Sequence, residues 1–403
     1  MIVKHYMIRQ LNKMKSSMFY FFILSLLLST ESNEEYVILV SFDGFRYDYT
    51  ERVQTQNFDY LEKWGVKAKS LKPVFPSFTF PNHYSIATGC YADKHKIIGN
   101  EFNSELGEYS YKNKSNVQDP KWYGAEPIWV TAEKNGIISA TYFWVGSEAP
   151  IGGYYPSYYK NYENGIKAKD KVDQVISWLK LPVDERPKLV CLYFDEPDHA
   201  GHVFGPDSNE VNDQIKNSDY ILGYLLRSLA ELDIYNEINL IVVSDHGMVE
   251  VSQNKVINLD NLNIKGVIEG KGPVVSVRSD DENLIDMDIP YITIASSKQN
   301  QKLHYHNSIY NYLLIADEGW MMYSNKYLKE HKGILPVKGM HGYLSENMNM
   351  HAIFYAFGSS IKESFHIDTF ELIHIYPLLC ELLGINPYHD IDGTINTLGN
   401  ILK

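Results

Sequence analysis

The chain has 403 residues, of which 44% are hydrophobic and 31 are tyrosines, so it can bury a large core and has a globular composition. Its formal net charge of −13 argues against non-specific binding to a nucleic-acid duplex or to an anionic membrane surface. Three cysteines do not make a disulfide framework, and Cys191 and Cys380 lie in apolar patterns typical of buried thiols.

The first 30 residues have the pattern of a secretory signal peptide. Basic residues precede an apolar run from Met18 to Leu28, which is short for a membrane span. An uncleaved N-terminal anchor is the alternative. No later apolar run is long enough to cross a bilayer, and the sequon Asn113-Lys114-Ser115 is a candidate glycosylation site. We therefore expect a secreted glycoprotein without a stable membrane span.

Strand-like and helix-like segments alternate from residue 36 onward. Three continuous apolar runs, at residues 37–43, 189–195 and 240–245, each end in an aspartate. Such runs are typical of strands buried on both faces of a parallel sheet. Helical patterns mark residues 58–64, 126–134, 169–180, 211–232 and 370–383. The alternation predicts an α/β fold with a doubly wound, mostly parallel sheet, in one main domain over residues 34–403.

Three regions show no clear helical or strand periodicity. Residues 101–122 and 152–164 are polar and rich in tyrosine, and we expect loops there. Between residues 250 and 335, short β-like runs alternate with polar segments. This third region indicates inserted loops or a small inserted subdomain.

A hydroxyl between two prolines is the first candidate for chemistry. Thr79 lies between Pro76 and Pro81, and proline is tolerated in a helix only in its first turn. The apolar run that follows predicts a helix ending at Gly89. Thr79 is therefore expected just ahead of a helix N-terminus, where free backbone N–H groups favour an anion. A threonine hydroxyl needs a base or a metal to act as a nucleophile, and a simple capping role is the alternative.

Aspartates and histidines gather where the predicted strands end. Asp43, Asp198 and Asp245 follow the three apolar runs, and His202 and His246 accompany two of these aspartates. In an open α/β sheet, ligands bind at the carboxyl edge of the strands. Carboxylate oxygen and imidazole nitrogen suit zinc. The number of candidate ligands favours two ions over one, as in sites that promote in-line phosphoryl displacement.

With these residues in place, the chain strongly resembles the nucleotide pyrophosphatase/phosphodiesterase family of the alkaline phosphatase superfamily. The resemblance runs from about residue 36 to residue 403 and implies an alkaline-phosphatase-like catalytic domain. It rests on six motifs: SFDGFR from Ser41, KPVFPSFTFPNHYSIATG from Lys72, GAEPIWVTAE from Gly124, YFDEPDHAGH from Tyr193, SDHGM from Ser244 and GMHGY from Gly339.

The resemblance implies two zinc ions and a role for each candidate residue. The ligands of one ion would be Asp43, Thr79, Asp245 and His246, and those of the other Asp198, His202 and His341. Thr79 would attack phosphorus and become a phosphothreonine-type intermediate, which water would then release. Asn100 would hydrogen-bond a phosphoryl oxygen. By position, an aromatic slot for a nucleobase would comprise Phe80, Trp144 and Tyr162, with core packing as the alternative for the last two.

The implied reaction is hydrolysis of phosphodiester or pyrophosphate bonds in small nucleotides, which yields nucleoside 5′-monophosphates. Three alternatives stay open at this point. The same metal site would support a phospholipid- or choline-ester phosphodiesterase, or a phosphomonoesterase. An inactive homologue that acts as a secreted binding protein is the third. Glu148 stands where some members of the family have aspartate, which bears on the base preference.

Overall fold

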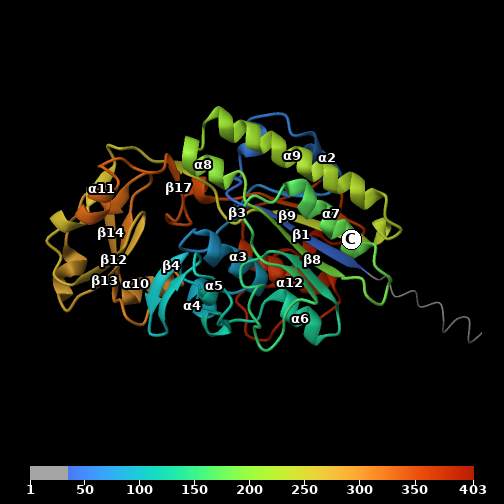
Figure 1. The fold of residues 1–403 in the computed structure, drawn as a ribbon, viewed down its shortest axis with the longest axis horizontal. Helices are drawn as coiled ribbons and strands as arrows, with labels where there is room; N and C mark the ends of the chain where they lie inside the picture. Colours follow the sequence, from blue (N-terminus) through green and yellow to red (C-terminus); the bar gives the residue numbers. More distant parts are fainter. Residues whose placement is uncertain (1–34) are drawn as a thin grey trace, which may run out of the picture. The chain divides into compact units, whose positions relative to one another are not determined.

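The computed structural model describes residues 35–403, so the predicted signal peptide lies outside the described part of the chain. Its centre is an eight-stranded sheet with the order β19-β2-β18-β9-β1-β8-β6-β7 (Figure 1). The strands are β1 (Tyr36–Phe42), β2 (Val66–Ala68), β6 (Ser139–Tyr142), β7 (Tyr158–Lys160), β8 (Leu189–Phe194), β9 (Ile238–Val243), β18 (Phe354–Gly358) and β19 (Phe365–Ile367). All run parallel to β1 except the antiparallel β18. The predicted mostly parallel sheet is confirmed.

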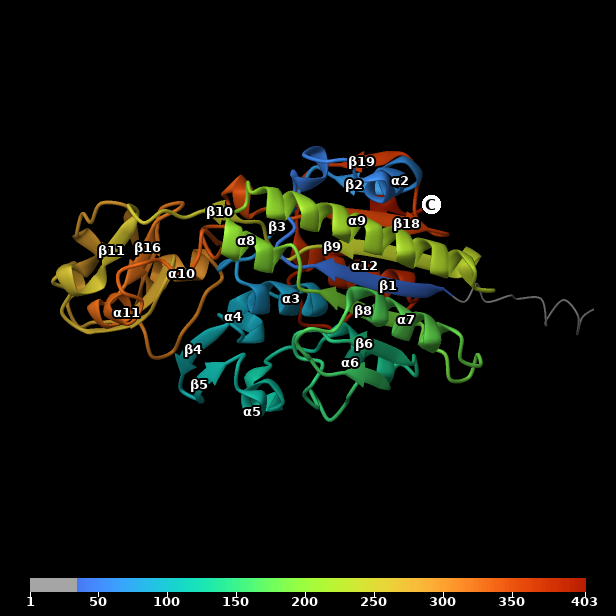
Figure 2. The same cartoon turned by 45° about the horizontal axis from the view of Figure 1, so that its top comes forward.

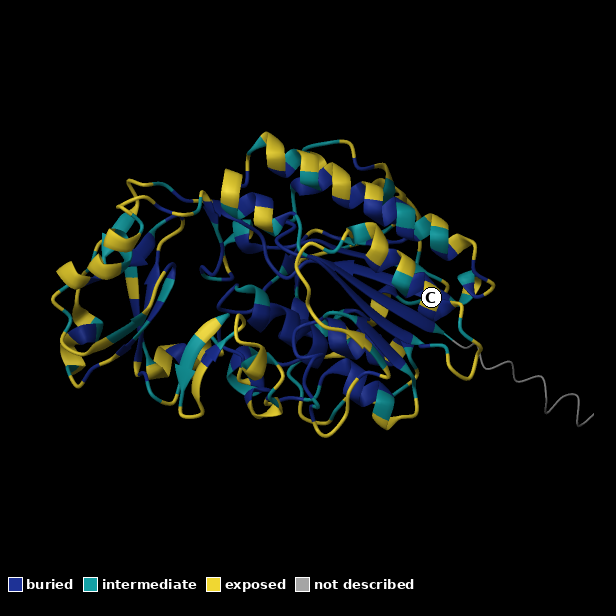
Figure 3. Cartoon of the chain, in the orientation of Figure 1, coloured by how far each residue is buried: buried dark blue, intermediate teal, exposed yellow. Residues whose placement is uncertain are grey.

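Helices cover both faces of this sheet because the side chains of its strands alternate between two apolar clusters. Val37 and Leu39 of β1 pack into one cluster, and Ile38 and Val40 pack into the other. The first cluster includes residues of α3 (Thr79–Thr88), α6 (Ile128–Lys134) and α12 (Ile375–Leu382). The second includes residues of α2 (Gln56–Trp64), α7 (Ala168–Leu179) and α9 (Asn209–Ala230) (Figure 2). The central strands are buried along their length, which explains their continuous apolar runs (Figure 3).

Parallel pairing in register brings three chain segments to one edge of the sheet. Phe42 at the end of β1 pairs with Phe194 at the end of β8, and Ser41 pairs with Val243 at the end of β9. The residues that follow these strands therefore lie close together. This register, set by apolar runs of similar length, positions the candidate site.

Two of the predicted loops contain regular structure. Residues 101–110 form a hairpin of β4 (Glu101–Ser104) and β5 (Gly107–Ser110), followed by the short helix α5 (Lys114–Val117). The prediction of a loop over residues 101–122 was wrong because the two strands are short and largely polar, so neither shows an apolar alternation. Within residues 152–164, β7 adds a short edge strand to the sheet.

Residues 250–335 form a second β-structure with its own apolar cluster. Its four-stranded antiparallel sheet has the order β12-β13-β15-β14, with the bounds β12 (Val267–Gly270), β13 (Val274–Arg278), β14 (Ile292–Ser296) and β15 (Tyr312–Ala316). A short parallel pair, β11 (Val256–Asn258) and β16 (Met321–Tyr323), and the helix α11 (Asn325–Glu330) accompany it. Ala295, Leu313 and Ile315 pack against Phe75 and Ile98 of the main part of the fold.

The chain returns to the main sheet through β17 (Gly339–Met340), which pairs with β10 (Val249–Glu250) and leads directly to His341. Among residues 35–403, no helix combines the length and the apolar character that crossing a bilayer requires. The three cysteines are buried and free, as their apolar surroundings in the sequence indicated for Cys191 and Cys380.

Candidate active site

Asp43, Asp245 and His246 form one group of metal-binding character at the carboxyl edge of the sheet. Asp43 follows β1, and the other two residues follow β9 after Ser244. His246 Nε2 lies 3.4 Å from Asp43 Oδ1 and 3.0 Å from Asp245 Oδ2. All three side chains are buried. The structure thus brings together three of the four predicted ligands of one ion, and the fourth, Thr79, lies beside them.

Asp198, His202 and His341 form a second such group. Asp198 begins the short helix α8 (Asp198–Phe204), so His202 lies one helical turn later on the same face. His202 Nε2 lies 3.4 Å from Asp198 Oδ2 and 3.2 Å from His341 Nε2. The ring of His341 stacks on that of His246, with centroids 3.5 Å apart, so the two groups adjoin.

Each of the three histidines uses its Nδ1 atom in a hydrogen bond to a backbone carbonyl. His246 bonds Gly247 O at 2.9 Å, His202 bonds Gly339 O at 2.9 Å, and His341 bonds Ser77 O at 2.8 Å. A carbonyl accepts only, so each Nδ1 carries the proton and each Nε2 presents a lone pair to its group. Metal-ligating histidines are commonly fixed in this way.

Three buried carboxylate oxygens in these groups have no hydrogen-bond partner: Asp43 Oδ1, Asp198 Oδ1 and Asp245 Oδ2. A buried, unpaired carboxylate oxygen is costly, so a cation at each group would compensate it. Mixed carboxylate and imidazole donors are the set that zinc accepts. The residues present therefore fit two zinc ions.

The electrostatics of the groups agree with this fit. Burial, with the negative charges of Asp245 and Asp198, raises the pKa of Asp43 well above its ordinary value. Burial alone would also raise the pKa of Asp245, but His246 and His83 hold it well below that value. Against the effect of burial, Asp245 raises the pKa of His246 in return, so a proton on His246 competes with a metal for its Nε2 atom. Burial lowers the pKa of His341, and the neighbouring His246 and His202 lower it further. His341 is therefore neutral and available as a donor ligand.

Thr79 is the first residue of α3, one position later in the helix than expected, because Phe78 is the N-cap; the helix ends at Gly89, as predicted, with a left-handed φ of 67°. Its hydroxyl Oγ1 lies 3.2 Å from His246 Nε2. The Oδ1 atom of Asn100 accepts a hydrogen bond from the backbone N–H of Phe80 at 2.9 Å. This bond holds the Asn100 side chain at the start of the helix, beside Thr79, with its amide N–H groups available as donors.

His83 is a residue of the site that the sequence analysis missed. It lies one turn after Thr79 on α3, and its Nδ1 atom is 3.0 Å from Thr79 O and 3.2 Å from Asp245 Oδ2. Its Nε2 atom bonds Ser41 Oγ at 2.8 Å. The i, i+4 spacing from Thr79 is the signal that could have identified it.

The three aromatic residues of the expected nucleobase slot have different surroundings. Trp144 is fully buried in the core, and its indole N–H donates to His83 O at 2.9 Å. This burial favours core packing, the alternative that the sequence left open for Trp144. Tyr162 is 41% exposed, and its backbone N–H donates to Glu148 Oε1 at 2.8 Å. Phe80 packs against Tyr111, an exposed aromatic that the sequence analysis did not single out.

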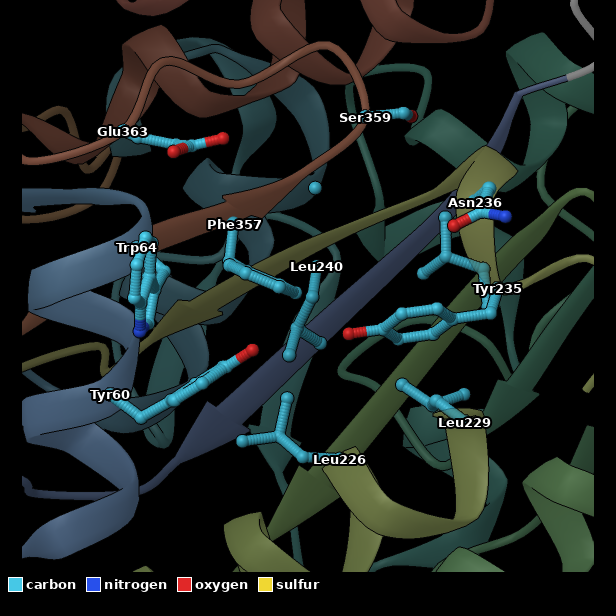
Figure 4. A pocket seen from close by; sticks show the side chains of 12 residues that line it. Tyr60, Trp64, Leu226, Leu229, Tyr235, Asn236, Leu240, Phe357, Ser359 and Glu363 are labelled. Carbon is cyan, nitrogen blue, oxygen red and sulfur yellow. The ribbon is translucent and has the colours of Figure 1, made fainter. Parts of the chain in front are cut away.

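A cavity of about 760 Å³ opens beside the second metal-binding group. Its lining includes His202, His341 and Asn100, together with residues of the β4–β5 hairpin and of the 250–335 region. A separate cavity of about 290 Å³ lies between α2, α9 and the start of β9, with Tyr60, Trp64 and Tyr235 among its lining residues (Figure 4). That second cavity contains none of the candidate ligands, so it is not the candidate active site.

A profile described as type I phosphodiesterase/nucleotide pyrophosphatase matches residues 37–344. The chain belongs to this family. It is 36% identical to human ectonucleotide pyrophosphatase/phosphodiesterase family member 1 over 389 residues, which covers 91% of this chain and 42% of that protein. It is also 36% identical to the venom phosphodiesterase CdcPDE of Crotalus durissus collilineatus, covering 91% of this chain and 46% of that protein.

Human family member 5 is matched over more of its length, with 34% identity over 377 residues that cover 77% of that protein. Solved structures of member 5 confirm the fold of the family. The human structure superposes with a TM-score of 0.85 at 32% identity and covers 92% of this chain. A murine structure, described as inactive through a threonine-to-alanine substitution and in complex with AMP, gives a TM-score of 0.84 at 31% identity. The chain spans about half the length of most of the curated relatives described, including the venom enzymes.

Proposed function

We propose that the protein is a secreted, zinc-dependent phosphodiesterase that hydrolyses nucleotide phosphodiester or pyrophosphate bonds and releases nucleoside 5′-monophosphates. The observation that carries the proposal is the placement of the Thr79 hydroxyl, at a helix N-terminus and 3.2 Å from His246, beside two adjoining groups of carboxylate and imidazole donors. Membership in the phosphodiesterase family supports the reaction class.

One zinc ion would be held by Asp43, Asp245, His246 and Thr79, and the other by Asp198, His202 and His341. When bound, the two ions would supply Lewis-acid stabilisation to the attacking and leaving oxygens of an in-line phosphoryl displacement.

Thr79 acts as the nucleophile in this proposal. Its Oγ1 loses its proton and forms a bond to phosphorus as the bond from phosphorus to the leaving oxygen breaks, and an alcohol leaving group takes up a proton as it departs. A water oxygen then bonds to phosphorus, the bond to Thr79 breaks, and a proton of that water passes to Oγ1. The Asn100 amide N–H groups, held at the start of α3 by the bond from the Phe80 N–H to Oδ1, donate to the phosphoryl oxygens, where negative charge develops.

Phe80 and Tyr162 would bind the base of the nucleotide. Both belong to segments at the site, because Phe80 follows Thr79 and the ring of Tyr162 lies edge-on to that of Tyr193, whose hydroxyl donates to Asp43. Tyr162 is exposed, and an exposed aromatic face stacks on any nucleobase, whereas Phe80 is largely buried and packs against the exposed Tyr111. A murine relative binds AMP, which supports a nucleotide as the half of the substrate that stays bound to Thr79 after the leaving group departs.

Secretion is part of the proposal and rests on the N-terminal sequence pattern together with the sequon. Asn113 is exposed, and its side chain caps the start of α5. Expression in a secreting eukaryotic host should yield protein in the medium that loses mass on glycosidase treatment. Retention of the protein on cell membranes would contradict cleavage of the signal.

The decisive experiment measures initial rates on the nitrophenyl ester of thymidine 5′-monophosphate, with nitrophenyl phosphate and nitrophenyl phosphocholine as comparison substrates. We expect the nucleotide diester to be preferred, with activity lost on chelation and restored by zinc. Thr79→Ala should lower kcat at least about a thousandfold while zinc stays bound, and the exposed Thr394→Ala serves as the matched control. Full activity of Thr79→Ala, or preference for the choline ester, would overturn the assigned nucleophile or the assigned substrate.

A further inference from the structure

The 760 Å³ cavity is lined by His202 and His341 of the second metal-binding group, and by Phe78 and Asn100 near Thr79, but not by Thr79 itself or by the first group. Thr79 adjoins the group of Asp43, Asp245 and His246, whereas His202 and His341 of the other group line the cavity. In an in-line displacement the leaving oxygen departs on the side opposite the nucleophile. The leaving group of the proposed reaction is therefore directed into this cavity.

We propose that the cavity is a binding site for the leaving group and that it selects an uncharged alcohol, such as a nucleoside, over inorganic pyrophosphate. The inference rests on the proposed function and names the substrate class within it. Phosphodiesters between two nucleosides would be preferred to nucleoside triphosphates.

Apart from His199, the residues that line the cavity next to the ligands of the second metal-binding group are largely apolar. Phe78 lies edge-on to the ring of His341, with centroids 5.8 Å apart, and Val203, Val337 and Met340 also line the cavity. None of these side chains can donate a hydrogen bond or neutralise charge. A phosphate attached directly to the leaving oxygen would lose water here without gaining a partner.

The charged side chains that line the rest of the cavity include more carboxylates than ammonium groups. They are Glu101, Glu108, Glu269, Lys112 and Lys271. Lys112 already pairs with Glu101 at 3.1 Å, and Lys271 lies over the ring of Tyr327 at 5.0 Å. Glu269 accepts hydrogen bonds from Asn103 and Tyr310. A polyanion in this cavity would face net negative charge, which raises its free energy relative to a neutral group.

A nucleoside suits the remaining surfaces. Tyr111 is 43% exposed and supplies an aromatic face, and Asn307 and Ser276 supply polar atoms. The volume lies within the range of sites that bind drug-sized ligands, so the cavity has room for a second nucleoside beside the retained nucleotide. In the reaction, the bond from phosphorus to the nucleoside oxygen breaks, and that oxygen takes up a proton.

The test compares two substrates that share the AMP half: the dinucleoside monophosphate of two adenosines, which releases adenosine, and ATP, which releases pyrophosphate. For the zinc-loaded enzyme we expect kcat/KM to be at least about tenfold higher for the dinucleoside monophosphate. Glu101→Lys converts a carboxylate of the cavity wall into a cation and should shift this ratio severalfold toward ATP. The shift should be larger at low salt than at high salt.

Glu105→Lys is the matched control, because it makes the same charge change on the turn of the β4–β5 hairpin but does not line the cavity. The ratio should not change in this variant. Equal shifts in the two variants, or a wild-type preference for ATP, would overturn the inference.

Equilibrium binding of both substrates to zinc-loaded Thr79→Ala separates this inference from the proposed function. Tighter binding of the dinucleoside monophosphate than of ATP supports the cavity assignment even if Thr79 is not the nucleophile. Turnover of the nitrophenyl ester together with equal affinity for the two substrates would leave the proposed function standing and contradict the selectivity of the cavity.

Discussion

The hydroxyl of Tyr193 donates a hydrogen bond of 2.6 Å to Oδ2 of Asp43, and both side chains are buried. Tyr193 is the fifth residue of β8, and Asp43 follows β1, so the in-register pairing of these strands creates the contact. The ring of Tyr193 also lies edge-on to His83 and to Tyr162. One side chain therefore contacts a candidate metal ligand, a residue beside Thr79 and a candidate base-binding residue.

Replacement of Tyr193 by phenylalanine should weaken metal binding without removing a ligand. The variant leaves Asp43 Oδ2 without its donor, and loss of such a supporting bond commonly lowers metal affinity about 10- to 100-fold. Activity at limiting zinc should fall and should recover as zinc is added. A titration of activity and of bound zinc checks this, with the exposed Tyr220→Phe as control. Unchanged zinc affinity would show that Tyr193 does not position Asp43.

Asp43→Asn should have opposite effects on the stability of metal-free and zinc-loaded protein. Burial and the charges of Asp245 and Asp198 raise the pKa of Asp43, so its ionised form destabilises the folded state once the pH exceeds the unfolded pKa. At neutral pH the metal-free variant should therefore melt a few degrees above metal-free wild type. With zinc it should melt below wild type, because a ligand has been lost.

The melting temperatures of wild type and variant, each with chelator and with zinc, check this reversal. The exposed Asp286→Asn controls for a general effect of removing one negative charge. If Asp43→Asn lowers the melting temperature under both conditions, the carboxylate cluster is not the source of the instability.

We expect Tyr162 to contribute to substrate binding and Trp144 to contribute to the stability of the fold. Tyr162→Ala should raise KM for a nucleotide ester about tenfold, the size of one lost stacking contact, and should change stability little. Trp144→Phe should leave KM unchanged and destabilise the fold by about 1–3 kcal/mol, because His83 O loses its buried donor. Steady-state kinetics and urea denaturation of both variants test this, with the exposed Tyr155→Ala as control. A raised KM in Trp144→Phe alone would reverse the assignment.

His95 should contribute to acid denaturation. It is fully buried, and burial lowers its pKa to about 3, so it stays neutral in the folded protein. The stabilising effect of the neutral ring is complete above the unfolded pKa of about 6.5 and is lost as the pH falls from there toward 3, at up to about 1.4 kcal/mol per pH unit. Unfolding free energies from pH 7.5 to 4.5, measured with chelator, should fall less steeply in His95→Gln.

The exposed His389→Gln is the control for this measurement and should keep the wild-type slope. Equal slopes in wild type and His95→Gln would show that other groups cause the loss of stability at acid pH.

The sequence predicted the sheet and the convergence of its strand ends well, because β1, β8 and β9 are continuous apolar runs that each lead to an aspartate. That pattern depends on burial alone and needs no knowledge of distant partners. The pattern predicted that Asp43, Asp198 and Asp245 lie at one edge of the sheet, and the structure places them there. His341 could be identified as a candidate ligand only through the family resemblance, because it follows a two-residue strand after a long irregular region.

Features that depend on tertiary contacts were not visible in the sequence. Trp144 follows β6 like a loop residue, and only the packing of α3 against it shows that it is core. The β4–β5 hairpin pairs polar residues, so neither strand has an apolar face to reveal it. The contact between Tyr193 and Asp43 arises from strand register, which a one-dimensional pattern does not specify.

During synthesis, the last ligand of the first metal-binding group emerges before the last ligand of the second, because of their order along the chain. Asp43, Asp245 and His246 are all present once residue 246 has left the ribosome, whereas the second group waits for His341, roughly a hundred residues later. At the usual rate of translation this interval is about 5–20 s. A nascent chain would thus contain all four proposed ligands of the first site, Thr79 included, before the second site can form. Availability of metal during synthesis would then influence which chains reach the native state.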